Sequence, residues 1–209
     1  MSITLANVSC RYPTIHFGHY KIPNMGKPME IFIDIPIEWL VLEIDKQNNR
    51  FLLLSKYVLD WEGYANCPIF SFGNETSWEV SYLRRWLNNT FCEESFSKEE
   101  MLRILPTVIE TGNPDEEAVT DEIFFLSKEE VLKYFPEESE RITYQPMVYG
   151  GTGNAKSPIR VGYDPCFWWT RTSGKTADLV VCIAPGGELW EMDSNSSENG
   201  VRPAMWIKL

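Results

Sequence analysis

The chain has 209 residues, of which 44% are hydrophobic and 13% are aromatic, and its formal net charge is -11. So many apolar side chains can fill a substantial core, which excludes a mainly disordered chain. The negative charge and the lack of a basic run argue against a partner of nucleic acid and against docking on an anionic membrane.

The first clear elements form a predicted β-hairpin. PIEWLVLEID (36–45) and RFLLLSKYVLD (50–60) are two apolar runs, and the turn between them, KQNN, has a suitable polar composition. We therefore expect two antiparallel strands near the start of the chain.

The segment SWEVSYLRRWLNNTF (77–91) predicts an amphipathic helix capped by Ser77 and ending near Asn88. Its apolar face follows helical spacing. The residues on that face are Val80, Leu83, Trp86 and Leu87.

Two capping boxes predict two further short helices. Ser97 is followed three residues later by Glu100, and Ser127 is followed in the same way by Glu130. In this motif the serine hydroxyl accepts a bond from a free amide of the first turn, and the glutamate reaches back to the cap. A proline stands shortly after each expected helix end, where a helix should stop.

The remaining middle segments are less regular. The acidic stretch 110–122 indicates an exposed loop, and DEIFFLS (121–127) predicts a short strand that leads into the second capped helix. Residues 140–165 are rich in Gly, Pro and Tyr, which favours an irregular loop.

The last third is predicted to be β-structure. ADLVVCIAP (177–185) and ELWEMD (188–193) form a hairpin around two glycines, and VRPAMWIKL (201–209) is the last strand. Pro203 cannot donate to a ladder, so this strand should lie at an edge or carry a bulge.

Strands, then helices, then strands predict an α+β fold in one domain, residues 1–209. We expect a mostly antiparallel twisted sheet with flanking helices and long loops. A loop-rich face should be built from about residues 140–200.

Three short motifs resemble sites but lack essential parts. GGTGNAKS (150–157) has alanine where a phosphate-binding loop needs its second glycine, and no helix is predicted after it. His16 and His19 have no placed metal partner, so we expect one packed and one exposed histidine. DSNSSENG (193–200) lacks the glycine and the distal glutamate of a calcium loop. We expect no metal, no cofactor and no catalytic residue that the sequence identifies.

Two arginines stand among apolar residues, Arg171 in WWTRTSG (168–174) and Arg202 in NGVRPAMWI (199–207). A guanidinium can stack on an aromatic ring and donate up to five hydrogen bonds, and it must be paired when it is buried. In one interpretation both arginines tie loop carbonyls or carboxylates to the closing strands. In the other they face a groove and bind an anionic or polar ligand.

These stretches also carry a family resemblance over residues 16–209. HFGHY, PIEWLVLE, SWEVSYLRRWLNNTFCEESFSKEE, DEIFFLSKEE, WWTRTSG and NGVRPAMWI occur in the order found in a bacterial domain family of unknown function. The family pattern closes with WWLRS and GVRPALWI. The chain departs from it at Thr170, where leucine is usual, and at Thr172, where serine is usual.

More distantly, the closing pattern resembles the C-type-lectin-like and formylglycine-generating folds. This resemblance implies that the N- and C-terminal strands pair with each other. The formylglycine-generating activity does not carry over, because Cys166 and Cys182 do not stand in its metal-binding motif. Lectin calcium motifs are also absent from the sequence.

We therefore expect a non-catalytic domain that binds a protein or glycan through its loop face. The expected ligand contacts are Trp168, Trp169, Arg171 and Trp190. Aromatic and arginine side chains carry much of the binding energy at interfaces. The expected structural residues are Arg84, Trp86, Arg202 and Trp206. One alternative is an enzyme on a formylglycine-generating-like fold whose site the sequence does not identify. The other is a structural or assembly subunit of a mobile element.

We also expect a cytoplasmic protein. No stretch reaches the ~20 apolar residues of a membrane span, and the first residues lack the basic and apolar regions of a signal peptide. The five cysteines are widely spaced and include no CxxC pair, which favours free thiols over disulfides or a zinc site.

Overall fold

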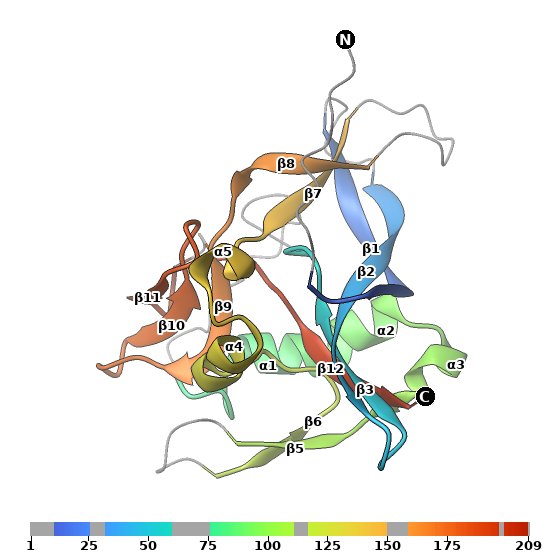
Figure 1. Ribbon diagram of the computed structural model, residues 1–209, viewed down its shortest axis with the longest axis horizontal. Coiled ribbons are helices and arrows are strands. Elements are labelled where there is room, and N and C mark those ends of the chain that lie inside the picture. The colour runs from blue at the N-terminus through green and yellow to red at the C-terminus, as the bar shows by residue number, and fades with distance from the viewer. Residues whose placement is uncertain are drawn as a thin grey trace.

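The computed structural model describes residues 11–25, 32–59, 76–110, 117–149, 159–196 and 199–208 (Figure 1). The described strands form mostly antiparallel sheets, and a few short helices accompany them, as an α+β fold requires. The largest sheet has seven strands. In spatial order they are β4 (Ile104–Leu105), β12 (Ala204–Lys208), β3 (Arg50–Ser55), β2 (Phe32–Asp45), β1 (Thr14–Met25), β7 (Tyr144–Tyr149) and β8 (Ile159–Pro165).

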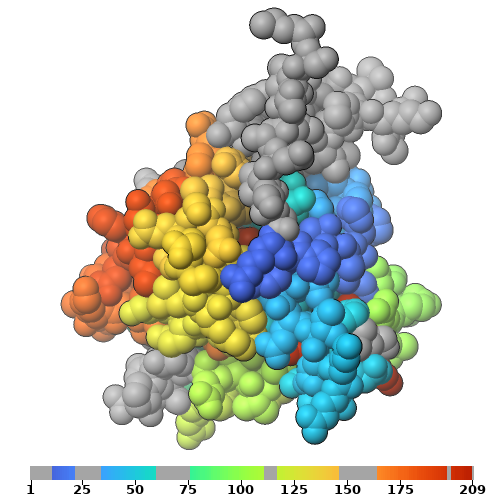
Figure 2. Space-filling view, viewed as in Figure 1, coloured from blue at the N-terminus to red at the C-terminus, as the bar shows by residue number. Residues whose placement is uncertain are grey.

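Two smaller sheets complete the β-structure of the described residues. A three-stranded sheet has the order β11 (Leu189–Asp193), β10 (Leu179–Ile183), β9 (Trp168–Ser173), and a two-stranded hairpin joins β5 (Thr107–Ile109) to β6 (Val119–Asp121). Among the pairings between two described strands only that of β1 with β7 is parallel, and an isolated bridge between Trp168 and Gly200 is parallel as well. Residues 159–193 form one side of the molecule, drawn orange to red in Figure 2.

The two hairpins predicted from turn composition are confirmed. β2 pairs with β3 around residues 46–49, and Asn49 adopts a left-handed φ of 55° in the turn. β10 pairs with β11, and Gly187 has φ 95° in the connecting turn. Asparagine and glycine tolerate this backbone region better than other residues, which is why these turns form where they do.

Both capping boxes are also confirmed. They begin α3 (Lys98–Met101) and α4 (Lys128–Tyr134). At α4 the Ser127 Oγ accepts from the Glu130 amide (3.2 Å), and the Glu130 carboxylate accepts from the Ser127 amide (2.8 Å). These bonds satisfy amides that a short helix leaves free at its start.

The helix predicted over 77–91 exists but both of its limits were wrong. It comprises α1 (Tyr82–Trp86), a π-helical turn η1 (Leu87–Phe91) and α2 (Cys92–Ser95). The cap is Ser81, whose Oγ accepts from the Arg84 amide at 3.1 Å. Val80 precedes the helix and is 46% exposed, so it does not belong to the buried face.

Asn88 explains why the helix continues past its predicted end. Its side-chain amide donates to the carbonyls of Arg84 (3.0 Å) and Ile123 (2.8 Å), and its Oδ1 accepts from the amide of Glu122 (2.8 Å). The side chain therefore bonds a distant segment and leaves the helix backbone intact.

Two predictions about residues 110–127 were wrong. Residues 121–127 do not form a strand: β6 ends at Asp121, and Phe124 makes a single bridge to Ala204. This run is apolar because it crosses the core. The loop predicted over 110–122 contains β6, while residues 111–116 lie outside the described residues.

The segment predicted to be irregular over 140–165 contains two paired strands. β7 and β8 form an antiparallel pair that extends the large sheet, with Met147 opposite Arg160. The glycines, prolines and tyrosines of this segment are typical of loops, but these strands lie near the margin of a sheet, where a proline is tolerated.

The last strand was predicted to lie at an edge or to carry a bulge, and both alternatives were wrong, because its register with β3 is continuous. β12 lies between β3 and β4, and Pro203 stands just before it, where its carbonyl accepts from the Ser55 amide at 2.9 Å. Within the described part of the chain, the first strand does not pair with the last one either. β2 and β3 separate β1 from β12 in the sheet.

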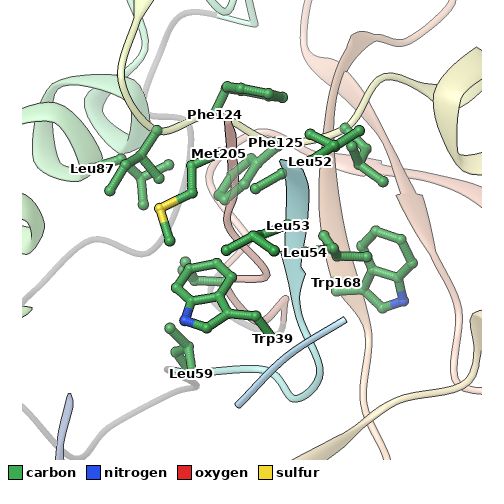
Figure 3. Close-up of a cluster of buried hydrophobic side chains, with 14 of the residues drawn as sticks. Trp39, Leu52, Leu53, Leu54, Leu59, Leu87, Phe124, Phe125, Trp168 and Met205 are labelled. Carbon is green, nitrogen blue, oxygen red and sulfur yellow. The ribbon is translucent and has the colours of Figure 1, made fainter. Parts of the chain in front are cut away.

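A cluster of buried side chains joins the first strands to the last ones (Figure 3). Trp39 and Leu53 of the large sheet pack in this cluster with Phe125, Trp168 and Met205. All five side chains are fully buried. The indole of Trp39 donates to the Phe17 carbonyl at 2.7 Å. No helix in the described part of the chain has both the length and the apolar character needed to cross a bilayer.

A hydrogen bond between α4 and β2 makes stability depend on pH. The Tyr134 hydroxyl donates to Glu43 (2.6 Å), Lys133 contacts the same oxygen (3.1 Å), and the tyrosine bond is the main cause that lowers the pKa of Glu43. A lowered carboxyl pKa stabilises the fold above the ordinary glutamate pKa, and this stability is lost as the pH falls through the lower folded-state value.

We expect Tyr134→Phe to lower the urea midpoint more at pH 7 than at pH 3. Tyr144→Phe is the control, and an equal effect of Tyr134→Phe at both pH values would contradict the linkage.

Candidate functional site

Four residues were expected to contact a ligand, and the structure places them in two different environments. Trp190 on β11 is 58% exposed. Trp168 and Trp169 on β9 are 0% exposed, and Arg171 on the same strand is 4% exposed. A ligand at the surface can therefore reach Trp190, whereas the other three side chains belong to the interior.

β9 is buried because other segments bond to its outer edge. The Trp169 amide donates to the Gly200 carbonyl (3.2 Å), and the Arg171 amide donates to the Leu126 carbonyl (3.1 Å). Thr170 is fully buried, and its hydroxyl donates to the Val181 carbonyl at 2.7 Å. This bond satisfies the hydroxyl inside the core.

The Arg171 guanidinium connects three segments. It donates to the carbonyl of Glu110 (3.0 Å), to the carbonyl of Phe125 (2.6 Å) and to the carboxylate of Glu130. Glu130 is the capping residue of α4, so one carboxylate serves both the helix start and the buried arginine. The arginine thus holds α4 and the run that crosses the core against β9.

The Arg202 guanidinium joins the end of β3 to the core. Its Nε donates to the Ser55 carbonyl at 2.9 Å. It also lies over the rings of Trp168 (4.7 Å) and Phe135 (5.5 Å), where the aromatic faces favour a cation. Arg202 is 2% exposed, so these contacts are made inside the protein.

A third buried arginine, Arg141 at the end of α5 (Glu138–Arg141), was missed by sequence reasoning. It is 5% exposed and donates to the carbonyls of Phe135 (2.7 Å), Pro136 (2.6 Å) and Gly187 (3.2 Å). Its own carbonyl accepts from the Trp168 indole at 3.0 Å. The surrounding segment EESERIT (137–143) is mostly polar, and no local pattern marks Arg141 as buried.

Arg84, one of the expected structural residues, pairs with a buried carboxylate. Its Nε donates to Asp121 at 2.7 Å, and the same carboxylate accepts from the Trp78 indole at 2.8 Å. Asp121 is 2% exposed, so both donors offset the cost of burying its charge. The group ties α1 to β6.

The two remaining expected structural residues are half-buried tryptophans. The ring of Trp86 packs against that of Phe91 with centroids 5.2 Å apart. The ring of Trp206 on β12 lies beneath the guanidinium of Arg50 at 4.2 Å. Both contacts join neighbouring elements of the scaffold.

The motifs that resembled metal or phosphate sites lie only partly within the described residues. His16 and His19 are both exposed on either side of Gly18, which has φ 70°, so the expectation of one packed histidine was wrong. Among the described residues, no group of three His, Cys, Asp or Glu side chains could hold a metal ion. Residues 150–157 lie outside the described residues, as does part of the loop 193–200.

The described thiols are not activated. Burial raises the pKa of Cys92 and of Cys182 to about 12, and it also raises the pKa of Cys166. A thiol with a raised pKa stays protonated at neutral pH and is a poor nucleophile. Cys10 and Cys67 lie outside the described residues.

The structure shows a surface groove of about 440 Å³ beside the exposed Trp190. In the register of β10 with β11, Val181 stands opposite Glu191, so alternation directs both side chains to the same face of the sheet. That face is the floor of the groove. The groove residues are Lys128, Lys175, Leu179, Val181, Leu189, Trp190 and Glu191.

The groove combines an apolar floor with charged walls. Lys128 begins α4, and Lys175 lies in the turn between β9 and β10, where its ammonium is 3.8 Å from the Glu191 carboxylate. The lining described here contains two cations, one carboxylate and no thiol, hydroxyl or imidazole. These side chains can hold a ligand that has apolar and anionic parts.

The expected site residues therefore divide between scaffold and groove. Among them only Trp190 lines the groove, and the other groove residues were missed. Lys128 and Lys175 are 47 residues apart in the chain, and nothing in their local sequence shows that both meet the β10–β11 sheet.

Comparisons with known proteins agree with the predicted resemblance at the family level. No curated protein and no solved structure matches the chain. The family model described as a domain of unknown function (DUF6273) matches residues 48–209, a span that contains β3, the groove and β12. Because this match covers most of its length, the chain belongs to the DUF6273 family.

Proposed function

We propose that this domain is a non-catalytic binding module that recognises a protein or glycan ligand at the groove beside Trp190. The observation that carries the proposal is the groove itself, whose apolar floor is formed by Leu179, Val181 and Leu189 and whose lining also includes the exposed Trp190 of β11. Tryptophan is enriched among residues that dominate binding energy, and a concave apolar site with a few charged groups is the usual form of a ligand site. Lys128 and Lys175 favour a ligand that carries negative charge.

The C-type-lectin-like architecture and a cytoplasmic location belong to the same proposal. The small sheet β9–β11 near the end of the chain supports the first, whereas the separation of β1 from β12 by two strands weighs against it. A crystal structure that superposes on C-type-lectin-like domains over both sheets would support this architecture. One that superposes over neither sheet would reject it.

Trp190→Ala tests the groove directly. Wild-type protein is screened against a glycan array and a random peptide library, and the selected ligands are titrated by calorimetry. We expect the variant to bind about 30-fold more weakly, which corresponds to the roughly 2 kcal/mol of a hot-spot residue.

Leu102→Ala is the matched control, because Leu102 is 83% exposed and does not line the groove. It should bind the selected ligands as the wild type does. If Trp190→Ala keeps full affinity for every selected ligand, the groove is not the binding site.

A further inference from the structure

The two edges of the β9–β11 sheet differ in how they are covered. The outer edge of β9 is closed by the backbone bonds from Trp169 to Gly200 and from Arg171 to Leu126. β11 forms the other edge, at the left of the molecule in Figure 1, and no backbone bond from the rest of the described chain reaches Leu189 or Glu191 on that side. β11 is thus an open edge next to the groove.

Hydrogen bonds at both ends of the β10–β11 ladder determine which groups point outward. The Ala184 amide donates to the Glu188 carbonyl (2.9 Å), and the Ser194 amide donates to the Asp178 carbonyl (2.8 Å). Bonded and non-bonded pairs alternate along an antiparallel ladder. The pairs at Trp190 and Met192 are therefore bonded to β10. The N–H and C=O groups of Leu189 and Glu191 point away from it.

β11 lacks the features that usually protect an edge strand. Its sequence LWEMD has no proline and no lysine, and its register with β10 is continuous, without a bulge. Native edge strands are normally blunted by such features, because free backbone groups pair readily with another strand. The carboxylate of Glu191 is the charge nearest the centre of this edge, and Lys175 lies 3.8 Å from it.

Charge decides between two occupants of this edge. A second copy paired along the whole of β11 would place Glu191 opposite itself, and like charges directly opposite each other destabilise a strand pair. A peptide need not place an acidic residue opposite Glu191, and its acidic residues elsewhere are attracted by Lys128 and Lys175, which line the adjacent groove.

We propose that an extended, acidic segment of a partner protein binds by adding a strand to the outer edge of β11. Its backbone bonds the free N–H and C=O groups of Leu189 and Glu191. Its side chains on the groove side meet the apolar floor and the lysines, while the alternate side chains pass along Trp190. This inference rests on the proposed function and specifies the ligand as a peptide held largely through its main chain.

The peptide itself provides the first test. Octapeptides are selected from a random library on wild-type protein, and each backbone amide of the best peptide is then N-methylated in turn. We expect acidic peptides whose affinity falls about tenfold at every second amide, because strand addition uses alternate N–H groups. Selection of no peptide, or a loss of affinity without this alternation, would overturn the inference.

Two substitutions at one position provide the second test. Both Glu191→Pro and Glu191→Gln remove the carboxylate, but only proline removes the outward N–H. Because that N–H does not bond β10, an edge strand should tolerate the proline. We expect Glu191→Gln to tighten the binding of the acidic peptide and Glu191→Pro to weaken it about tenfold. If both variants tighten binding, the main chain of β11 is not used.

Further measurements keep the outcomes distinct. Should Glu191→Pro fail to fold, amide exchange on the wild type replaces it, and the amides of Leu189 and Glu191 should slow when the peptide binds. Weakening by Trp190→Ala without any effect of N-methylation would retain the groove and reject strand addition. A wild-type dimer in sedimentation that Glu191→Pro dissociates would identify a second copy as the occupant and overturn the inference.

Discussion

Arg171→Met is expected to lower the free energy of unfolding by about 3–5 kcal/mol, the usual cost of removing one member of a buried charged group. The change leaves the carbonyl of Phe125 without its bond from the guanidinium, and Phe125 is 0% exposed. The carboxylate of Glu130 contributes less to the loss, because its side chain is 33% exposed and keeps contact with water. Urea unfolding measures the change. For a chain of this size the melting temperature should fall by on the order of 10 °C.

Two variants identify the cause of that loss. Arg171→Lys keeps the charge but has a single ammonium that cannot reach all three acceptors, so its stability should lie between those of the wild type and Arg171→Met. Arg85→Met is the control, since Arg85 is exposed on the neighbouring helix α1. If Arg171→Met unfolds at the same urea concentration as Arg85→Met, the guanidinium does not hold these segments together.

Trp168→Ala is expected to cost about 3–5 kcal/mol, as large-to-small substitutions of buried aromatic residues do. The substitution opens a cavity in the core, removes the bond from the indole to the Arg141 carbonyl, and takes away the ring beneath the Arg202 guanidinium. Calorimetric unfolding measures the loss of stability.

Trp190→Ala is the matched comparison, because it removes the same side chain from an exposed position on the same sheet. Its stability should change by less than about 0.5 kcal/mol, as is typical of surface substitutions. The pair of variants separates the two roles that the sequence had assigned jointly to these tryptophans. Equal losses of stability would mean that Trp190 is part of the core, and its exposure in the structure would then not describe the protein in solution.

The amino-acid sequence by itself determined the local elements of this protein. A serine and a glutamate three residues apart start α3 and α4, since both partners of each capping bond lie within one turn. Polar and glycine-rich turns between apolar runs likewise gave the hairpins β2–β3 and β10–β11.

Predictions failed where a distant segment supplies the partner. Asn88 looks like a helix end, but its amide bonds the segment at Ile123 and the helix continues. The strands β7 and β8 look irregular because the large sheet, and not their composition, supplies the ladder that orders them.

The candidate site could be predicted only in part. Trp190 was named among the expected contacts. Trp168, Trp169 and Arg171 were named with it as aromatic or arginine side chains, but they lie in the interior. Whether an indole is a ligand contact or a core residue depends on what covers it. β9 is covered on its outer edge by segments from elsewhere in the chain, whereas no backbone bond from the described residues covers the outer edge of β11.

Only the tertiary structure decided which groups the buried arginines bond and which residues form the groove. The acceptors of Arg141 and Arg202 are main-chain carbonyls, which almost every residue possesses, so no residue type marks them in the sequence. Lys128 and Lys175 meet the β10–β11 sheet because α4 and a turn are packed against it. Local preferences act over a few residues, whereas burial and long-range bonds depend on how the whole chain packs.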